Sequence, residues 1–234
     1  MPIAMITGAS KGLGRALAAA LAQLGWDLVL DARTAGVLRE TARELSRLYG
    51  TRVVAVAGDV TDGAHRKALV AAAGELDVLV SNASALGAEP LVPLESLPLA
   101  GLREALETNV VAALGLAQEA LPLLRASAAG AVVTVSSDAA AEPYPTWGGY
   151  GASKAALDQL AAVLGEEEPG LRVWAVDPGD MRTDLSTAAV PGDAGPRPGP
   201  ESVAPAFVRL LERRPAGGRY AAAALLEEKD GERR

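Results

Sequence analysis

The chain contains no cysteine and a single histidine, and these two scarcities exclude much chemistry. Without cysteine there can be no disulfide and no thiol nucleophile. A transition-metal site would also lack its usual ligands, so no metal site is predicted. The one histidine, His65, stands among polar residues and is interpreted as a surface side chain.

Basic residues and long apolar runs are also scarce. The 22 Lys and Arg are outnumbered by 29 Asp and Glu, and the net charge of −7 argues against nucleic acid or an anionic membrane as a partner. No apolar run reaches the ~18 residues of a membrane span. A glycine-rich motif already begins at residue 7, which leaves no room for a signal peptide, so we expect a cytoplasmic protein.

What the chain does have is an alternation of strand-like apolar runs with helix-length amphipathic segments. Its 234 residues, half of them hydrophobic, fit a single domain over 1–234. Alternation with continuously apolar strands predicts an α/β fold, a doubly wound parallel sheet of about seven strands with helices on both faces. The expected strands are 3–7, 28–30, 53–57, 78–80, 132–135, 173–176 and 219–225, and the expected helices are 13–24, 36–49, 62–73, 100–125, 149–165 and 202–213.

Ligands bind to such a sheet beyond the carboxyl ends of its strands. Gly14, Asp59, Asn82, Ser137 and Pro178 each fall at or just after the end of an expected strand. We therefore expect these residues to converge on one site.

The first expected strand leads into the segment Thr7-Gly-Ala-Ser-Lys-Gly-Leu-Gly14. Glycines let the backbone turn tightly and approach a pyrophosphate, while the following helix offers free N–H groups and the positive end of its dipole. The segment therefore predicts a nucleotide-binding turn.

Tyr150 and Lys154 lie four residues apart within an expected helix, and Ser137 precedes the tyrosine by thirteen residues. Residues at i and i+4 share a helix face, so the ammonium can stabilise a phenolate whose unperturbed pKa is ~10. Together with the nucleotide-binding turn, this group indicates a nucleotide-dependent redox enzyme.

In this order the motifs resemble those of the short-chain dehydrogenase/reductase family, from residue 3 to about residue 225. The resemblance implies a Rossmann-type fold and hydride transfer between a nicotinamide cofactor and a carbonyl or alcohol substrate. The matching positions are Thr7-Gly8-x-x-x-Gly12-x-Gly14, Asp59, Asn82-Ala83, Asn109, Ser137, Tyr150 with Lys154, and Pro178-Gly179-x-x-x-Thr183.

The resemblance implies four catalytic residues. Tyr150 is the general acid in reduction, and Lys154 lowers the pKa of that tyrosine and hydrogen-bonds the nicotinamide ribose. Ser137 polarises the substrate oxygen; its neighbour Ser136 competes for this role, and the thirteen-residue spacing selects Ser137. Asn109 matches the asparagine that holds a water in the proton relay, although an asparagine inside a helix can also simply bond to nearby backbone.

The resemblance also implies the cofactor-binding residues. Asp59 with Val60 binds the adenine edge; the alternative for Asp59 is a helix N-cap, for which Thr61 is the better candidate. The full set is Gly8, Ser10, Lys11, Gly12, Leu13, Gly14, Arg33, Asp59, Val60, Asn82, Ala83, Tyr150, Lys154, Pro178, Gly179 and Thr183.

Two cations favour NADP(H) over NAD(H). An NAD enzyme places a carboxylate at the end of the second strand, where alignment with the family puts Ala32; Arg33 follows, and Lys11 adds a cation in the glycine loop. Asp31 should point away from the ribose because side chains alternate along a strand. A shift of one residue in this alignment would reverse the preference.

Three features depart from the family pattern or from regular structure. Residues 184–200 end in a stretch too rich in proline and glycine for regular structure, and we interpret them as a substrate lid, with a plain linker as the alternative. Residues 226–234 form a charged tail. The family's Asn-Asn-Ala-Gly is Ser81-Asn-Ala-Ser84 here, which adds a hydroxyl near the pocket.

The sequence does not identify the substrate. Three aromatic residues lie close together in the sequence, at Tyr144, Trp147 and Tyr150. They could form one side of a pocket for an apolar ketone, or they could contact a neighbouring subunit. Family members often assemble through the helices that span 100–125 and 149–165 here, so we expect a homodimer or homotetramer.

The leading hypothesis is an NADP-dependent reductase of a small ketone or aldehyde, or the reverse alcohol dehydrogenase. A 3-oxoacyl thioester reductase is the alternative enzyme, and the net charge of −7 disfavours it because an acidic carrier protein would need a basic docking patch. A non-catalytic nucleotide-sensing relative is disfavoured because Tyr150 and Lys154 are both present.

Overall fold

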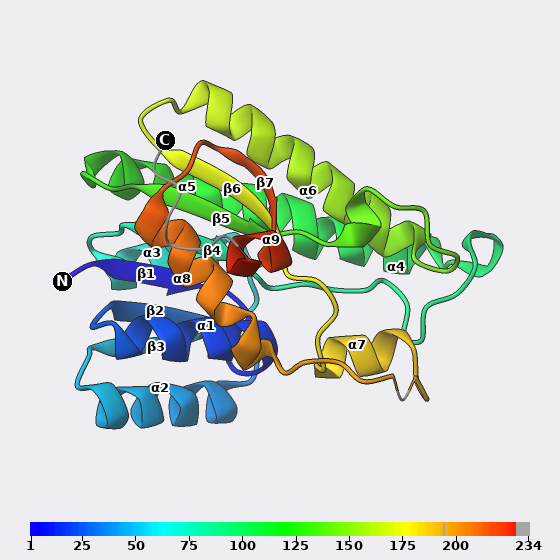
Figure 1. Cartoon of the computed structure of the whole chain (residues 1–234), viewed down its shortest axis with the longest axis horizontal. Coiled ribbons are helices and arrows are strands. Elements are labelled where there is room, and N and C mark those ends of the chain that lie inside the picture. The colour runs from blue at the N-terminus through cyan, green and yellow to red at the C-terminus, as the bar shows by residue number, and fades with distance from the viewer. Residues whose placement is uncertain (194, 228–234) are drawn as a thin grey trace.

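The computed structural model describes residues 1–193 and 195–227. Seven parallel strands form one sheet in the order β3-β2-β1-β4-β5-β6-β7 (Figure 1). The strands are β1 (Ile3–Ile6), β2 (Asp27–Ala32), β3 (Val53–Ala57), β4 (Val78–Ser81), β5 (Ala131–Val135), β6 (Arg172–Asp177) and β7 (Gly218–Ala221). The predicted doubly wound, Rossmann-type sheet is confirmed.

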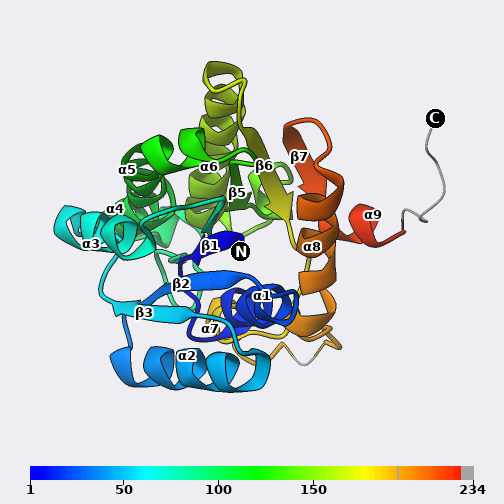
Figure 2. The ribbon, with the colours of Figure 1, turned by 90° about the vertical axis from the view of Figure 1, so that its left-hand side faces the viewer.

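Helices cover both faces of this sheet (Figure 2). One face carries α1 (Gly12–Gln23), α2 (Ala35–Tyr49) and α8 (Ala204–Arg213). The opposite face carries α3 (Gly63–Ala73), α4 (Leu99–Leu106), α5 (Ala112–Ala126) and α6 (Gly148–Glu167). Two short helices, α7 (Asp184–Ala189) and α9 (Ala222–Glu227), follow β6 and β7.

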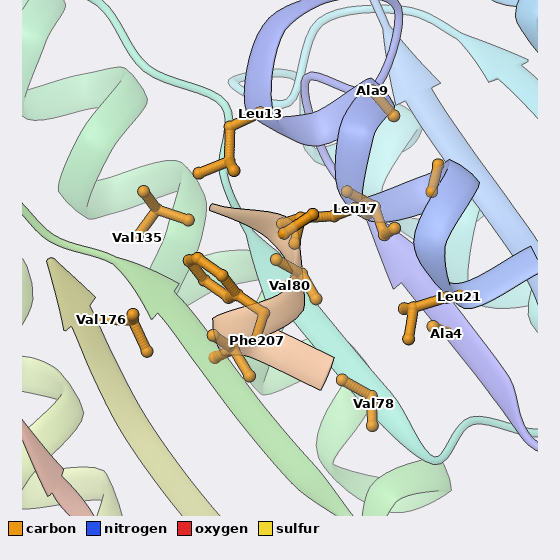
Figure 3. Packing of buried hydrophobic residues seen from close by; sticks show 14 of the residues in the cluster. Ala4, Ala9, Leu13, Leu17, Leu21, Val78, Val80, Val135, Val176 and Phe207 are labelled. Carbon is orange, nitrogen blue, oxygen red and sulfur yellow. The ribbon is translucent and has the colours of Figure 1, made fainter. Parts of the chain in front are cut away.

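The central strands are mainly apolar because their successive side chains enter the two layers alternately. In β1, Ala4 and Ile6 pack toward α1, whereas Ile3 and Met5 pack toward α3 and α5. Figure 3 shows the layer on the α1 side, where helix side chains meet those of several strands. Its labelled members include Leu13, Leu17, Phe207, Val80, Val135 and Val176.

Two of the expected elements differ from the sequence prediction in type or in continuity, beyond shifts of one or two residues at their ends. The strand expected over 219–225 was wrong beyond Ala221, because residues 222–227 form α9, whose Ala and Leu residues favour a helix. The single helix expected over 100–125 is interrupted by a π-helical turn, η2 (Glu107–Val111), in which Ala112 N–H bonds to the carbonyl of Glu107. A π turn inserts one residue without changing the apolar character, so periodicity does not reveal it.

The strand order reverses at β1, which lies between β2 and β4. The connections that leave β1 and β4 therefore diverge, and a crevice opens beyond their carboxyl ends. In Figure 1, α7 stands off from the layers beyond these ends. The fold thus brings the turns after six strands to one edge.

Two further sequence predictions concern membranes and the tail. Across residues 1–193 and 195–227, none of the helices is long and apolar enough to cross a bilayer. In the predicted charged tail, residues 226 and 227 belong to α9, and residues 228–234 lie outside the described residues.

Candidate active site

A cleft of about 590 Å³ opens at the carboxyl ends of the strands. The assigned residues that line it are Gly8, Ser10, Lys11, Gly12, Leu13, Arg33, Asp59, Val60, Asn82, Ala83, Ser137, Tyr150, Lys154, Pro178, Gly179 and Thr183. Gly14 and Asn109 stand behind this lining, in contact with residues that form it. In the described part of the chain, His, Asp and Glu form no group of three that could hold a metal ion.

The glycine-rich turn is locked to the loop after β4. Asn82 Nδ2 donates to the carbonyls of Thr7 at 2.8 Å and Gly8 at 3.3 Å. Gly8 has φ +65, and a Cβ there would lie 2.9 Å from Asn82 Nδ2. A Cβ on Gly14 would overlap the carbonyl of Gly8. Glycine is therefore required at both positions for α1 to start this close to the turn.

The start of α1 is suited to an anion. Its N-cap residue Lys11 makes no side-chain capping bond to the described residues, and the first turn carries no acidic residue. Gly12 has φ +56, and a Cβ there would meet only the side chain of Thr183, at 3.6 Å. The start of α1 thus has no side-chain cap and no acidic neighbour in its first turn, as a phosphate-binding helix start requires.

His65 is not a surface residue, so the sequence interpretation was wrong. It is 9% exposed, its Nε2 lies 2.7 Å from Asp31 Oδ1, and a Cβ on Gly58 would overlap its ring. The polar neighbours in sequence were misleading because the partner of His65 comes from β2, across the β2–α3 packing. Burial raises the pKa of Asp31, and the hydrogen bond with His65 opposes that rise.

Asp59 forms a tight turn and is not the N-cap of α3. It accepts bonds from the backbone N–H of Thr61 at 2.9 Å and from its hydroxyl at 2.8 Å. The backbone bond is the main cause that lowers the pKa of Asp59. The N-cap is Asp62, which accepts from Ala64 N–H at 2.8 Å, and not Thr61 as predicted.

Tyr150 and Lys154 lie on one face of α6, as their spacing predicts. Tyr150 is 7% exposed and Lys154 is 1% exposed. Lys154 Nζ lies 5.5 Å from the centre of the tyrosine ring and donates to the carbonyl of Val135 at 2.7 Å. Trp147 meets the other side of the ring edge-on, at 5.6 Å between ring centres.

Burial dominates the electrostatics of this pair. It raises the pKa of Tyr150 to about 12 and lowers the pKa of Lys154 to about 8. The shift of the tyrosine is opposite to the depression expected from Lys154, because the loss of water around the phenol is the largest cause and the charges of Asp138 and Asp177 add to it. A phenol that holds its proton at neutral pH is a proton donor, which is what a general acid must be.

Of the two neighbouring serines, Ser137 faces the tyrosine. Ser137 and Tyr150 both line the cleft, and the Ser137 hydroxyl opposes the rise of the tyrosine pKa. Ser137 Oγ also donates to Asp138 Oδ1 at 3.0 Å. Ser136 is buried, and its hydroxyl donates to Asp158 Oδ2 at 2.7 Å.

Sequence reasoning missed Arg219, an arginine of β7 whose side chain contacts Ser137 and Asp158 beside the cleft. Its Nη2 donates to the carbonyl of Ser137 at 2.9 Å, and its Nε lies 3.1 Å from Asp158 Oδ2. No local signal could have identified it, because it reaches Ser137 from 82 residues further along the chain.

Asn109 in the π turn is 1% exposed and works as a clamp. Its Nδ2 donates to the carbonyl of Ala85 at 2.9 Å and to Ser153 Oγ at 2.8 Å. Its Oδ1 accepts from Ala85 N–H at 2.8 Å and from Ser84 Oγ at 3.2 Å. Both N–H groups and both acceptor positions of the amide are thus bonded to protein groups, and the role of Asn109 in a water relay stays a prediction.

The predicted lid begins as a regular helix. Over residues 184–200 the sequence predicted no regular structure, yet α7 covers Asp184–Ala189, because a capping box between Thr183 and Ser186 closes its first turn. Lys11 Nζ lies 2.6 Å from Asp184 Oδ2, so the glycine loop touches this helix. Val190, Asp193 and Arg197 from the same segment line the cleft, and sequence reasoning did not single them out.

Comparisons with known proteins agree with this geometry. A family model described as short chain dehydrogenase matches residues 2–193. Sepiapterin reductase of Mus musculus is 34% identical over 201 residues, which cover 80% of this chain and 77% of the relative. A rhamnolipid-biosynthesis 3-oxoacyl-[acyl-carrier-protein] reductase of Pseudomonas aeruginosa is 35% identical over 188 residues, covering 76% and 72%.

A solved structure shares the fold as well. A short chain dehydrogenase of Shigella flexneri, complexed with NADP, superposes with a TM-score of 0.88 at 29% identity, covering 95% of this chain and 97% of that one. Family match, identity and fold agree, and the chain belongs to the short chain dehydrogenase family of oxidoreductases.

Proposed function

We propose that the chain is an NADP(H)-dependent oxidoreductase that reduces a ketone or aldehyde, or oxidises the corresponding alcohol. The observation that carries the proposal is the buried side chain of Tyr150, which lines the cleft together with Ser137 and keeps its proton at neutral pH because burial raises its pKa to about 12. Lys154 lies one helical turn away on the same face.

The residues of the cleft fit a dinucleotide. The uncapped start of α1 and the open side of Gly12 suit a pyrophosphate. Asp59 and Val60 would hold the adenine edge, Asn82 and Ala83 the adjoining ribose, and Pro178, Gly179 and Thr183 the nicotinamide end. When bound, such a cofactor supplies the hydride that reaches the carbonyl carbon.

Preference for NADP(H) rests on the charges near the end of β2. Arg33 is exposed and lines the cleft, as Lys11 does. Asp31 carries the other group that could bind here, a carboxylate that would favour NAD(H) by bonding the ribose 2′-hydroxyl. Its side chain is 2% exposed and is already hydrogen-bonded to His65. The Shigella flexneri relative was solved with NADP, which supports the same choice here.

In reduction, the protein must deliver a proton to the oxygen that gains charge. The Tyr150 O–H bond breaks and an O–H bond forms on the substrate, which leaves a phenolate. Ser137 donates to the same substrate oxygen, and Arg219 fixes the serine backbone. Lys154 is hydrogen-bonded to the carbonyl of Val135 and supplies the positive charge beside the phenolate. In oxidation each proton moves in the opposite direction.

The proton donor is tested by Tyr150→Phe, which keeps the ring and removes the hydroxyl. Turnover of NADPH with carbonyl substrates should fall by the ~10²–10⁴-fold that loss of a general acid causes, while NADPH still binds. Tyr49→Phe, at the exposed end of α2, is the matched control. Near-normal reduction by Tyr150→Phe with intact cofactor affinity would refute the mechanism.

Cofactor preference is tested by Arg33→Ala. The loss of a charge-assisted hydrogen bond, roughly 1.5–3 kcal/mol, should weaken NADPH far more than NADH in fluorescence titrations. Arg39→Ala, an exposed arginine of α2 outside the cleft, should leave both affinities unchanged. Tighter binding of NADH than NADPH by the unmodified protein would overturn the preference.

A 3-oxoacyl thioester reductase remains the second candidate because the Pseudomonas aeruginosa relative bears that name. A panel of ketones, aldehydes and 3-oxoacyl thioesters, each with NADPH, distinguishes the two. Turnover of thioesters alone would select the second candidate, and tight cofactor binding without any turnover would favour a nucleotide sensor.

A further inference from the structure

The edge strand β7 lies next to β6 and carries Arg219 (Figure 1). Arg219 stands in register with Ala175 of β6, two residues before that strand ends at Asp177. The carboxyl end of β6, where the cleft opens, is therefore within reach of a long side chain on β7.

The guanidinium of Arg219 bonds to the loop that follows β5. Its Nη2 donates to the carbonyl of Ser137 at 2.9 Å. Its Nε donates to Asp158 Oδ2 at 3.1 Å, and the same oxygen accepts from the Ser136 hydroxyl at 2.7 Å. Both serines after β5 are therefore linked to Arg219, Ser137 directly and Ser136 through Asp158 of α6.

The same nitrogen also bonds to the turn that follows β6. Arg219 Nη2 lies 3.4 Å from Asp177 Oδ2. The other oxygen of this carboxylate accepts from the N–H of Gly179 at 3.0 Å. Gly179 has φ +71, which favours glycine, so its conformation and the carboxylate together shape the Pro178-Gly179 turn. Asp177, Pro178 and Gly179 all line the cleft.

These contacts lie mostly out of water. The side chains of Asp158 and Asp177 are 17% and 13% exposed. Asp158 Oδ1 is buried and has no hydrogen-bond partner within residues 1–193 and 195–227, so this carboxylate depends on the bonds of its other oxygen. A planar guanidinium presents several donors in fixed directions, whereas an ammonium is a compact charge on a flexible stem. Arg219 can therefore hold a carbonyl and two carboxylates in one arrangement.

We infer that Arg219 is a positioning residue that fixes the loop of the catalytic serine relative to the turn at the nicotinamide end of the cleft. The inference rests on the proposed function, in which Ser137 acts on the substrate oxygen and Pro178 and Gly179 hold the nicotinamide. Hydride and proton must reach the two atoms of one carbonyl group, so the two loops must keep a fixed separation. Arg219 bonds to both loops through the same nitrogen.

Arg219→Met tests the inference because it removes the guanidinium and keeps an unbranched side chain. Turnover of NADPH with a carbonyl substrate should fall by about 10- to 100-fold, the effect of misplaced reacting groups. NADPH should bind about tenfold more weakly, whereas adenosine 2′,5′-bisphosphate, which lacks the nicotinamide half, should bind as before. Arg172→Met, an exposed arginine at the opposite end of β6, is the matched control and should change none of these. Equal weakening of both ligands would overturn the inference.

Arg219→Lys separates position from charge. It keeps a positive charge beside Asp158 and Asp177, so the free energy of unfolding should return close to that of the unmodified protein. Turnover and NADPH affinity should stay low, because an ammonium lacks the fixed donors of the guanidinium. Full recovery of both by Arg219→Lys would reduce the role of Arg219 to charge compensation and contradict a positioning role.

Amide hydrogen exchange without ligand separates this inference from the proposed function. In Arg219→Met, exchange should become faster over residues 136–140 and 177–183, which the guanidinium holds, and stay unchanged over α1. Unchanged exchange in both segments would show that Arg219 does not join the two loops, whatever the activity. An unmodified protein that binds no NADPH would instead refute the proposed function, and the exchange result would still decide whether Arg219 joins the loops.

Discussion

Lys154 shows what burial of a charged side chain does to the stability of the fold. Its ammonium is almost fully buried and bonds to the carbonyl of Val135. Burial lowers its pKa to about 8, and the charge of Asp158 opposes that shift only in part. A group that is harder to charge in the folded state than in the unfolded state destabilises the fold wherever it is charged. The charged form of Lys154 therefore lowers the free energy of unfolding at neutral pH.

Lys154→Met should stabilise the protein at neutral pH while it abolishes activity. The folded-state pKa lies below the unfolded one, so the unfolded chain binds more protons between about pH 8 and 10.5, and the stability of the unmodified protein rises across this window. The free energy of unfolding of the variant at pH 7 should rise by on the order of 2 kcal/mol. This is the energy that corresponds to the pKa shift of Lys154, minus the contribution of its lost hydrogen bond to Val135.

Urea unfolding measured from pH 7 to pH 10 tests this expectation. The difference in free energy of unfolding between the variant and the unmodified protein should shrink as the pH rises. Lys67→Met, an exposed lysine of α3, should show no such dependence. A Lys154→Met protein less stable than the original at pH 7, or a constant difference across the range, would contradict the assignment.

At the scale of single residues, the sequence predicted what local spacing encodes. Tyr150 and Lys154 were found because a helix repeats every 3.6 residues, and Ser137 because its distance from Tyr150 matched the family. His65 was misread because its partner Asp31 lies 34 residues away and meets it only through packing of α3 on the sheet. Sequence neighbours give no measure of burial when the burying surface comes from another element.

At the scale of elements, the most informative disagreement is the segment 184–200. Residues 190–193 and 195–199, which the structure describes, lie in no helix or strand, as the proline and glycine content predicts, but the capping box at Thr183 and Ser186 starts a helix in the first half. The contact of Lys11 with Asp184 ties that helix to the glycine loop, and both side chains are largely exposed. An exposed ion pair stabilises by less than ~1 kcal/mol, so this contact alone does not hold the segment shut.

Residues 184–200 should therefore open locally at low free-energy cost. Amide hydrogen exchange measured by mass spectrometry should be fast over this segment, fastest beyond α7, and should slow when NADPH and substrate bind together. Thr183→Val removes the cap and should speed exchange in α7 alone. Strong protection of the whole segment without ligand would identify it as a fixed linker.

At the scale of the whole molecule, the alternation of apolar runs was enough to predict seven parallel strands and two helical layers. The central strands β1, β4 and β5 are buried on both faces, so they appear in the sequence as largely apolar runs. The edge strand β7 was less well predicted, because the apolar run continues from Tyr220 into α9. The convergence of loops on one cleft followed from the topology, whereas the bonds of Arg219 to Ser137 and of Asn109 to Ala85 did not.

The remaining large-scale expectation is assembly into a homodimer or homotetramer. The face formed by α4, η2 and α6 exposes Leu99, Val111 and Val163 at 66%, 49% and 40%. Exposed alanines, among them Ala152 and Ala155, continue this apolar surface along α6. Small side chains let two helices approach closely, and a stable interface needs roughly 1,200 Å² or more of buried surface, which helices of this length can supply.

Light scattering coupled to gel filtration should therefore give a mass of two or four chains at micromolar concentration. Val163→Glu places an unpaired charge within the predicted interface and should shift the protein toward monomers, because a buried charge without a partner is costly. Val37→Glu, equally exposed on α2 across the sheet, is the control and should leave the mass unchanged. A monomeric unmodified protein would exclude assembly, and dissociation caused by Val37→Glu but not by Val163→Glu would move the interface to the opposite face.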